Sequence, residues 1–229
     1  MSDIAPRIGT LGEKPLHASL KRWCSQPGDR FEVPVDRFVI DIVRGNRLIE
    51  VQTRGFSAMK RKATVLLEQG YELCIVHPIP VNKWIVKLDT NGEVLTRRRS
   101  PKHGTPMDIF TELVSFPNLV AHPHLEIKVL LIDEEEMRFH TPDRSWRRKG
   151  WSIKERRLLD VVDIVTIAAN NDLAAFLPAG LPVPFTTADL AAELGRPRRL
   201  AQQMTYCLRV AEVISATGKK GNAIEYEIV

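Results

Sequence analysis

Apolar runs lie on either side of the dipeptide Gly45-Asn46 in the stretch 38–52. Both flanking runs are rich in Val and Ile, and Gly-Asn suits a two-residue turn with positive φ, so the pattern predicts a β-hairpin. A turn on Gly45-Asn46 sets the register and places Asp41 directly opposite Glu50. Because side chains alternate between the two faces of a strand, Gln52 shares a face with these acids.

Two facing acids are unfavourable in a hairpin that has only a structural role. Directly opposite Cβ atoms lie roughly 5 Å apart. At an effective dielectric constant of about 20, the repulsion between Asp41 and Glu50 is about 3 kcal/mol. A divalent cation between the carboxylates would remove this repulsion, and Mg²⁺ prefers oxygen ligands. The hairpin therefore predicts a metal site. The alternative is a solvated face that carries two unrelated acids.

The rest of the first 143 residues predicts a mixed α/β arrangement. Helices are expected at about 16–25, 57–68 and 107–114, and strands at 31–35, 71–77, 81–88, 93–98 and 125–132. Pro78 and Pro80 are expected to end the strand at 71–77. The acidic run Glu134-Glu135-Glu136 is expected to end the unit.

A second unit is expected after a basic linker at 144–150. Ser152 and Glu155 have capping-box spacing, and the apolar residues that follow predict a helix to about Phe176. Next come a short helix at 188–194, a turn at Gly195, a helix at 198–211, and strands at 213–216 and 223–229. This order is typical of a winged helix-turn-helix. The expected domains are therefore residues 1–143 and 144–229.

The hairpin and its flanks resemble the PD-(D/E)XK nuclease core. In that core an Asp is followed by Glu-x-Lys on the next strand, and then by a helix and another strand. Here Asp41 is followed by Glu50-Val51-Gln52, and the surrounding residues are similar to the branch that contains Holliday-junction resolvases and related repair nucleases. The resemblance covers roughly residues 10–80. It implies an α/β, mixed-sheet, restriction-endonuclease-like core, and the element order above adds a winged helix-turn-helix domain after it.

The resemblance implies an endonuclease that cleaves DNA phosphodiester bonds with Mg²⁺ or Mn²⁺. Asp41 and Glu50 would be the metal ligands, and the ion would polarise the phosphate and acidify an attacking water. Gln52 stands where most members of the family have lysine. A neutral amide can orient a water but adds no positive charge near the transition state. The competing expectation is thus a non-catalytic, winged-helix DNA-binding regulator with a degenerate nuclease-like core.

Three further residues are candidates for the same site. Glu13 matches a glutamate in the first helix of this nuclease branch, although it is also the capping-box acid after Thr10. Lys60 and Lys62 lie on the next helix and could supply the positive charge that Gln52 lacks. Their alternative role is a solvated basic face.

The second candidate surface lies at the start of the predicted helix 198–211. Arginine binds phosphate or guanine edges, glutamine can recognise adenine, and lysine at a hairpin tip suits phosphate contact. The candidate DNA-binding residues are Arg196, Arg198, Arg199, Gln202, Gln203, Lys219 and Lys220. The alternative is a domain that docks another protein or a second copy.

Composition narrows the class of protein only moderately. The net charge of +5 over 229 residues is consistent with a polyanionic partner such as DNA. No apolar run reaches the ~20 residues of a membrane span. The three cysteines, Cys24, Cys74 and Cys207, are far apart, so reduced and buried thiols in a cytoplasmic protein are expected. Nucleases with this core often pair, so the resemblance also implies a homodimer. A third, less favoured function is an interaction module without nucleic acid.

Overall fold

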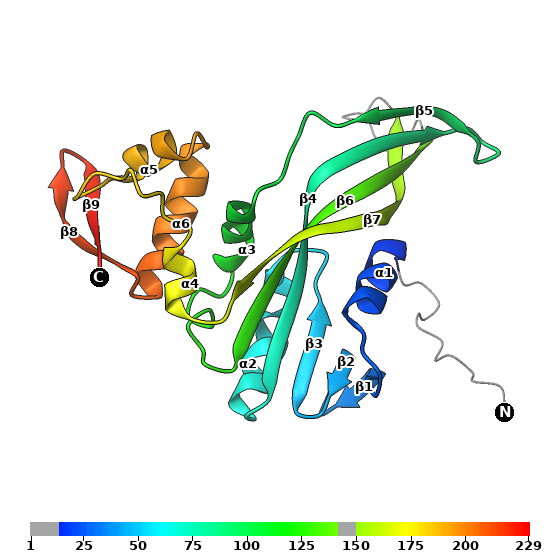
Figure 1. Ribbon diagram of the computed structural model, residues 1–229, viewed down its shortest axis with the longest axis horizontal. Helices are drawn as coiled ribbons and strands as arrows, with labels where there is room; N and C mark the ends of the chain where they lie inside the picture. The colour runs from blue at the N-terminus through cyan, green and yellow to red at the C-terminus, as the bar shows by residue number, and fades with distance from the viewer. Residues whose placement is uncertain (1–13, 142–149) are drawn as a thin grey trace. The chain divides into compact units, whose positions relative to one another are not determined.

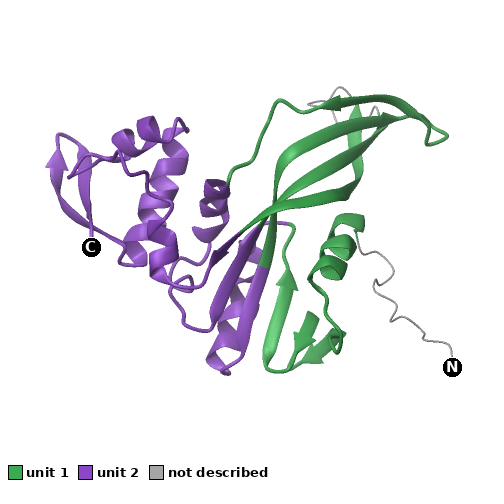
Figure 2. Cartoon of the chain, viewed as in Figure 1, with its two compact units in different colours: residues 1–53, 76–105, 130–164 green, residues 54–75, 106–129, 165–229 purple. Residues whose placement is uncertain are grey.

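The computed structural model describes residues 14–141 and 150–229 and shows a mixed α/β protein. Its described strands form a seven-stranded sheet and a separate two-stranded sheet, β8-β9 (Figure 1). The order in the larger sheet is β1-β2-β3-β4-β6-β7, and β5 pairs with β4. The chain divides into two compact units (Figure 2). Unit 1 contains residues 1–53, 76–105 and 130–164, and unit 2 contains residues 54–75, 106–129 and 165–229.

Unit 1 begins with a helix and three antiparallel strands. These are α1 (Pro15–Cys24), β1 (Arg30–Val35), β2 (Phe38–Arg44) and β3 (Arg47–Val51). The predicted hairpin is confirmed: Gly45 takes a φ of +59° in the turn, and Ile42 lies opposite Ile49. Both of these isoleucines are buried, so a slip of one residue would expose apolar side chains and is disfavoured.

The break expected at Pro78 and Pro80 is wrong, because β4 runs without interruption from Glu72 to Leu88. Alternate residues of a strand direct their N–H groups to the same edge, so both missing donors fall on one edge of β4. The Pro80 carbonyl accepts the N–H of Gly104 at 2.9 Å. A Cβ on residue 104 would lie 2.8 Å from that carbonyl oxygen, which explains the glycine there.

The end expected at the acidic run is also wrong. Strand β6 extends from Leu125 to His140, and both Glu134 and Glu136 are buried within it. Neighbouring cations on β4, β6 and β7 pair with these two carboxylates, which makes their burial tolerable. β5 (Val94–Arg99) pairs antiparallel with β4, as predicted.

The helix expected from Ser152 is wrong: residues Trp151–Ile167 form the long strand β7. Its Leu and Val residues do fall at helical spacing, but Val and Ile dominate its second half, and β-branched side chains favour strands. The linker expected at 144–150 falls almost entirely outside the described residues, as does the boundary at 143.

Unit 2 holds most of the helices. Its helical elements before β7 are η1 (Phe56–Met59), α2 (Lys60–Glu68), η2 (Pro106–Ile109) and α3 (Phe110–Leu113). After β7 come α4 (Asn170–Ala174), α5 (Thr187–Glu193), α6 (Arg198–Val210), β8 (Ile214–Lys220) and β9 (Ala223–Ile228). The predicted order of helix, turn, helix and hairpin is confirmed over 187–228. Thr186 caps α5, since its hydroxyl accepts the N–H groups of Ala188 and Asp189.

The remaining sequence expectations concern cysteines and membrane spans. All three cysteines are free thiols; Cys74 and Cys207 are buried, whereas Cys24 is only half-buried. Across residues 14–141 and 150–229, the helices lack the combination of length and apolar character that a membrane crossing requires.

Candidate functional site

Asp41 and Glu50 face each other one position beyond the Ile42–Ile49 pair of the hairpin. The backbone N–H of Asp41 donates to Oε1 of Glu50 at 3.2 Å. The backbone N–H of Val51 donates to Oδ2 of Asp41 at 2.8 Å. Each carboxylate therefore accepts a hydrogen bond from a backbone N–H of the opposite strand. This is expected for two acids that lie directly opposite each other in a hairpin. Their role as metal ligands stays a prediction.

Helix α1 adds an imidazole to this pair. Nε2 of His17 lies 3.2 Å from Oδ2 of Asp41, and the two side chains are only 22% and 14% exposed. Burial alone would raise the pKa of Asp41. The contact with His17, the Val51 N–H and the charge of Lys21 outweigh burial and hold that pKa below its ordinary value. Asp41 is therefore a carboxylate at neutral pH.

Lys21, one helical turn after His17, places a buried ammonium in unit 1. Its side chain is fully buried, and its ammonium forms an ion pair with Glu32 on β1. Glu32 has a φ of +50°, a conformation that a residue with a Cβ rarely adopts. Backbone strain of this kind often accompanies functional sites. Glu32, with its positive φ, thus places its carboxylate beside the buried ammonium of Lys21.

The backbone of Gln52 is fixed on both sides. Its N–H donates to the Val76 carbonyl at 2.8 Å, and its own carbonyl lies 2.7 Å from Nδ1 of the buried His77. Gln52 therefore follows the end of β3 with a fixed backbone, and the role of its side chain at the acid pair stays a prediction.

The other predicted site residues are not all described. Glu13 and its partner Thr10 lie outside the described residues. Lys60 is exposed and Lys62 is half-buried on α2, which belongs to unit 2, whereas the acid pair belongs to unit 1. The structure therefore does not test whether either lysine serves the acid pair.

The oxygen ligands at the acid pair suit some metals better than others. Among residues 14–141 and 150–229, no three His, Cys, Asp or Glu side chains are grouped so as to hold a metal ion. Structural or catalytic zinc usually takes three or four protein ligands. Mg²⁺ is commonly held by one or two carboxylates together with waters and substrate phosphates. Asp41 and Glu50 therefore fit Mg²⁺ or Mn²⁺.

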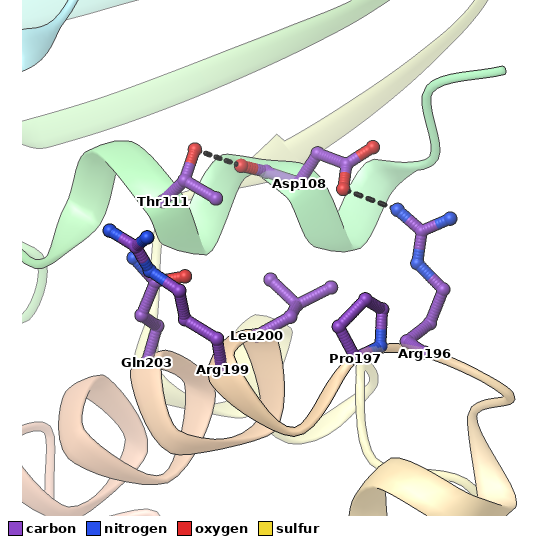
Figure 3. Close-up of a pocket in the computed structure, with 7 residues that line it drawn as sticks. All are labelled: Asp108, Thr111, Arg196, Pro197, Arg199, Leu200 and Gln203. Atoms are coloured by element: carbon purple, nitrogen blue, oxygen red, sulfur yellow. Dashed lines mark hydrogen bonds and ion pairs between the residues drawn. The ribbon is translucent and has the colours of Figure 1, made fainter. Parts of the chain in front are cut away.

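The candidate DNA-binding residues of unit 2 divide into two groups. Arg196 forms an ion pair of 2.5 Å with Asp108 of η2. Arg199 and Gln203 line a cavity of about 320 Å³ together with Asp108 and Thr111 (Figure 3). These three residues of the candidate set therefore face η2 and α3 within the same unit. The buried Nε of Arg196 has no hydrogen-bond partner among the described residues.

The second group points away from this cavity. Arg198 and Gln202 are exposed on α6. Lys219 and Lys220 are exposed at the end of β8, next to the turn at Gly221. These four side chains are accessible to a partner of unit 2.

The chain also shares sequence with known proteins. A family model described as Domain of unknown function (DUF8091) matches residues 14–168. This chain belongs to the DUF8091 family. A relative from Treponema pallidum (strain Nichols), named "Uncharacterized protein", is 30% identical over 185 residues, which cover 80% of this chain and 73% of the relative. No solved structure matches the chain.

The DUF8091 match includes every strand of the large sheet and the acid pair. It ends just after β7, so the helices and hairpin at 170–228 lie outside it. The DUF8091 domain therefore coincides with the sheet, not with the DNA-binding candidates on α6 and β8.

In this DUF8091 chain, His17 and Lys21 act on the Asp41 carboxyl, and no sequence motif singled them out. They are four residues apart and so share one face of α1, a spacing that could have drawn attention to them. That spacing is common on solvated helix faces, however, and only the folded structure brings α1 beside the acid pair.

Proposed function

We propose that this chain is an endonuclease that uses Mg²⁺ or Mn²⁺ at Asp41 and Glu50 to cleave DNA phosphodiester bonds. The observation that carries the proposal is the mutual bracing of the two carboxylates by backbone N–H groups at 3.2 and 2.8 Å. These hydrogen bonds hold the negative charges of Asp41 and Glu50 close together at a partly buried position. A divalent cation would relieve that repulsion, and when bound it would polarise a phosphate and lower the pKa of a water.

The protein's own residues would have distinct tasks in this reaction. Gln52 would orient the attacking water through its amide. His17 would hold Asp41 in place, since its ring contacts Oδ2 at 3.2 Å. Lys21 would add positive charge behind Asp41, where it already lowers the pKa of that carboxyl.

The DNA would be held by residues 170–228, which we propose form a winged helix. Exposed Arg198 and Gln202 on α6, with Lys219 and Lys220 on the hairpin, would contact the duplex. Arg196 would have a different role, because its guanidinium is already paired with Asp108. A cytoplasmic location and a homodimer remain predictions from sequence.

A second candidate function is a DNA-binding regulator without nuclease activity. The observation in its favour is the neutral Gln52, which adds no positive charge at the position where lysine is usual. In that case residues 170–228 would carry the function, and the acid pair would be a remnant of a metal site.

The experiment that separates the two functions is a cleavage assay with several DNA forms. Supercoiled, linear, single-stranded and branched DNA are incubated with purified protein in Mg²⁺, Mn²⁺ or EDTA. Cleavage that requires a metal and is lost in both Asp41→Ala and Glu50→Ala would support the nuclease. Cleavage that survives both substitutions would contradict the site, and salt-sensitive binding without cleavage would favour the regulator.

A further inference from the structure

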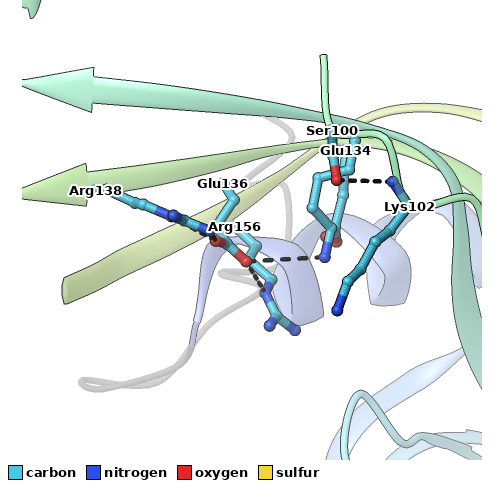
Figure 4. A network of polar contacts seen from close by, with 7 residues as sticks. Ser100, Lys102, Glu134, Glu136, Arg138 and Arg156 are labelled. Atoms are coloured by element: carbon cyan, nitrogen blue, oxygen red, sulfur yellow. Dashed lines mark hydrogen bonds and ion pairs between the residues drawn. The ribbon is translucent and has the colours of Figure 1, made fainter. Parts of the chain in front are cut away.

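Unit 1 carries a cluster of charged residues away from the acid pair. We define the Glu136 cluster as Lys83 on β4, Glu134, Glu136 and Arg138 on β6, and Arg156 on β7 (Figure 4). Glu134 and Glu136 are two residues apart on one strand and therefore share a face of the sheet. Three adjacent strands thus bring their charged side chains to one place.

Glu136 is the centre of this cluster. Its Oε1 accepts hydrogen bonds from Nε and Nη2 of Arg138 at 2.8 and 2.5 Å. Its Oε2 lies 3.5 Å from Nε of Arg156 and 3.8 Å from Nζ of Lys83. Nζ of Lys83 also lies 2.9 Å from Oε1 of Glu134. The two atoms form an ion pair, but their geometry is not that of a hydrogen bond.

The two carboxylates are hidden, whereas the cations reach the surface. The side chains of Glu134 and Glu136 are 2% and 4% exposed. Those of Arg138, Lys83 and Arg156 are 18%, 22% and 40% exposed. Solvent therefore meets the positive ends of the cluster, which has one more cation than carboxylates.

Two more cations flank the cluster on the same unit. Arg98 of β5 lies opposite Ile85 and so shares the sheet face of Lys83. Lys102 lies beside the cluster in Figure 4, where its N–H donates to the Ser100 hydroxyl. Both side chains are exposed, and neither forms an ion pair with another described residue. Together these residues carry three more positive than negative charges.

Stability alone is a weak explanation for this arrangement. Burying carboxylates in a sheet is expensive, and an ion-paired network seldom stabilises a fold more than apolar side chains of similar size would. The buried acids do fix the positions of three long cationic side chains. Cations that are already ordered lose little conformational entropy when they bind an anion, and arginine suits the geometry of phosphate.

We propose that this face of unit 1 binds the phosphate backbone of DNA through Arg98, Lys102 and Arg156, with the Glu136 cluster holding Arg156 in position. The inference rests on the proposed function, because the acid pair lies on the same unit and requires the same substrate. A spread of cations over neighbouring strands roughly 5 Å apart suits a chain of phosphates better than a single small anion.

The test measures the affinity for a labelled DNA duplex by fluorescence anisotropy at several salt concentrations in EDTA, so that no cleavage intervenes. The double variant Arg98→Gln, Arg156→Gln leaves Glu136 with two cations, and circular dichroism confirms its folding. The log–log salt slope of binding should become shallower by roughly 1 to 2, because each lost phosphate contact removes about 0.9. The double variant Arg98→Lys, Arg156→Lys should retain the wild-type slope.

The matched control is Arg37→Gln, which removes an exposed arginine of unit 1 at the β1–β2 turn. It should bind DNA like the wild type. An unchanged slope in the Arg98→Gln, Arg156→Gln variant would overturn the inference and leave the proposed function standing. A wild-type protein that does not bind DNA at all would overturn both.

Discussion

His17 holds the Asp41 carboxylate from a separate element, so its removal should disturb orientation while leaving both acids in place. The ring lies 3.2 Å from Oδ2 of Asp41. Loss of a group that orients a metal ligand typically lowers activity about 10- to 100-fold. We therefore expect His17→Ala to cut DNA more slowly by that factor while its affinity for DNA stays unchanged.

Two variants make the test of His17 specific. His17→Gln places an amide nitrogen near the position of Nε2 and should recover part of the rate. His122→Ala, in the loop before β6 in unit 2, should cut DNA at the wild-type rate. A wild-type rate for His17→Ala would show that the contact with Asp41 is incidental.

Glu136 predicts a pH dependence of stability. Burial alone would raise its pKa, but the hydrogen bonds and charge of Arg138, followed by the charges of Lys83 and Arg156, hold the pKa below its ordinary value. A carboxyl whose pKa is lower in the folded chain stabilises the fold above its unfolded pKa of about 4.3, and this is lost as pH falls through the folded pKa.

The measurement is chemical denaturation of the wild type and Glu136→Gln between about pH 6 and pH 3. The wild type should have the larger free energy of unfolding at pH 6, and the difference should shrink as the pH falls below about 4.3. A difference that stays constant over this range would contradict the account of Glu136.

At the residue scale, the site residues whose positions depend on the hairpin register could be predicted from the sequence. The facing of Asp41 and Glu50 follows from the turn at Gly45, because local geometry fixes it, whereas the shared face of Gln52 stays a prediction. His17 and Lys21 could not be predicted in the same way. Their contacts join α1 to the hairpin and β1 across the tertiary structure, and no local pattern records such a contact.

The start of α6 and the turn before it carry arginines with two different tasks, which substitution should separate. Arg198 is exposed, whereas Arg196 is paired with Asp108 at 2.5 Å and has a buried Nε. Arg198→Ala should weaken DNA binding and make its log–log salt slope shallower by about 1. Arg196→Ala should chiefly lower the free energy of unfolding, because it removes the ion pair with the partly buried Asp108.

For both variants, DNA affinity is measured by fluorescence anisotropy and the free energy of unfolding by chemical denaturation, on the same protein preparations. If the two variants lost DNA affinity equally and kept wild-type stability, the assignment of a structural role to Arg196 and a DNA-binding role to Arg198 would be wrong.

At the element scale, the prediction of helices and strands from sequence is wrong where one segment fits two patterns. β7 has apolar residues at helical spacing, but its Val and Ile content and its pairing in the sheet make it a strand. The prolines of β4 would normally end a strand, yet both fall on one edge of β4, where the Pro80 carbonyl accepts the N–H of Gly104. Tertiary pairing decided both cases, and no single sequence window contains that information.

At the scale of the whole molecule, the family match and the sheet coincide. The DUF8091 match spans residues 14–168, which include all seven strands of the large sheet. The mixed α/β class and the helix–turn–helix–hairpin order at the end of the chain were predictable from sequence, because each depends on local periodicity and turn residues. The assembly of two units from alternating segments was not, since it depends on long strands that contribute to both.

The central claim is that Asp41 and Glu50 form a metal-dependent nuclease site. The most direct measurement is the rate of supercoiled-plasmid cleavage in Mg²⁺ by the wild type, Asp41→Asn and the matched control Asp160→Asn on exposed β7. Asparagine keeps the shape of the side chain and removes the charge that would hold the ion. We expect Asp160→Asn to cleave like the wild type, and Asp41→Asn to be slower by at least about 100-fold with unchanged DNA affinity. Cleavage by Asp41→Asn at the wild-type rate would contradict the claim.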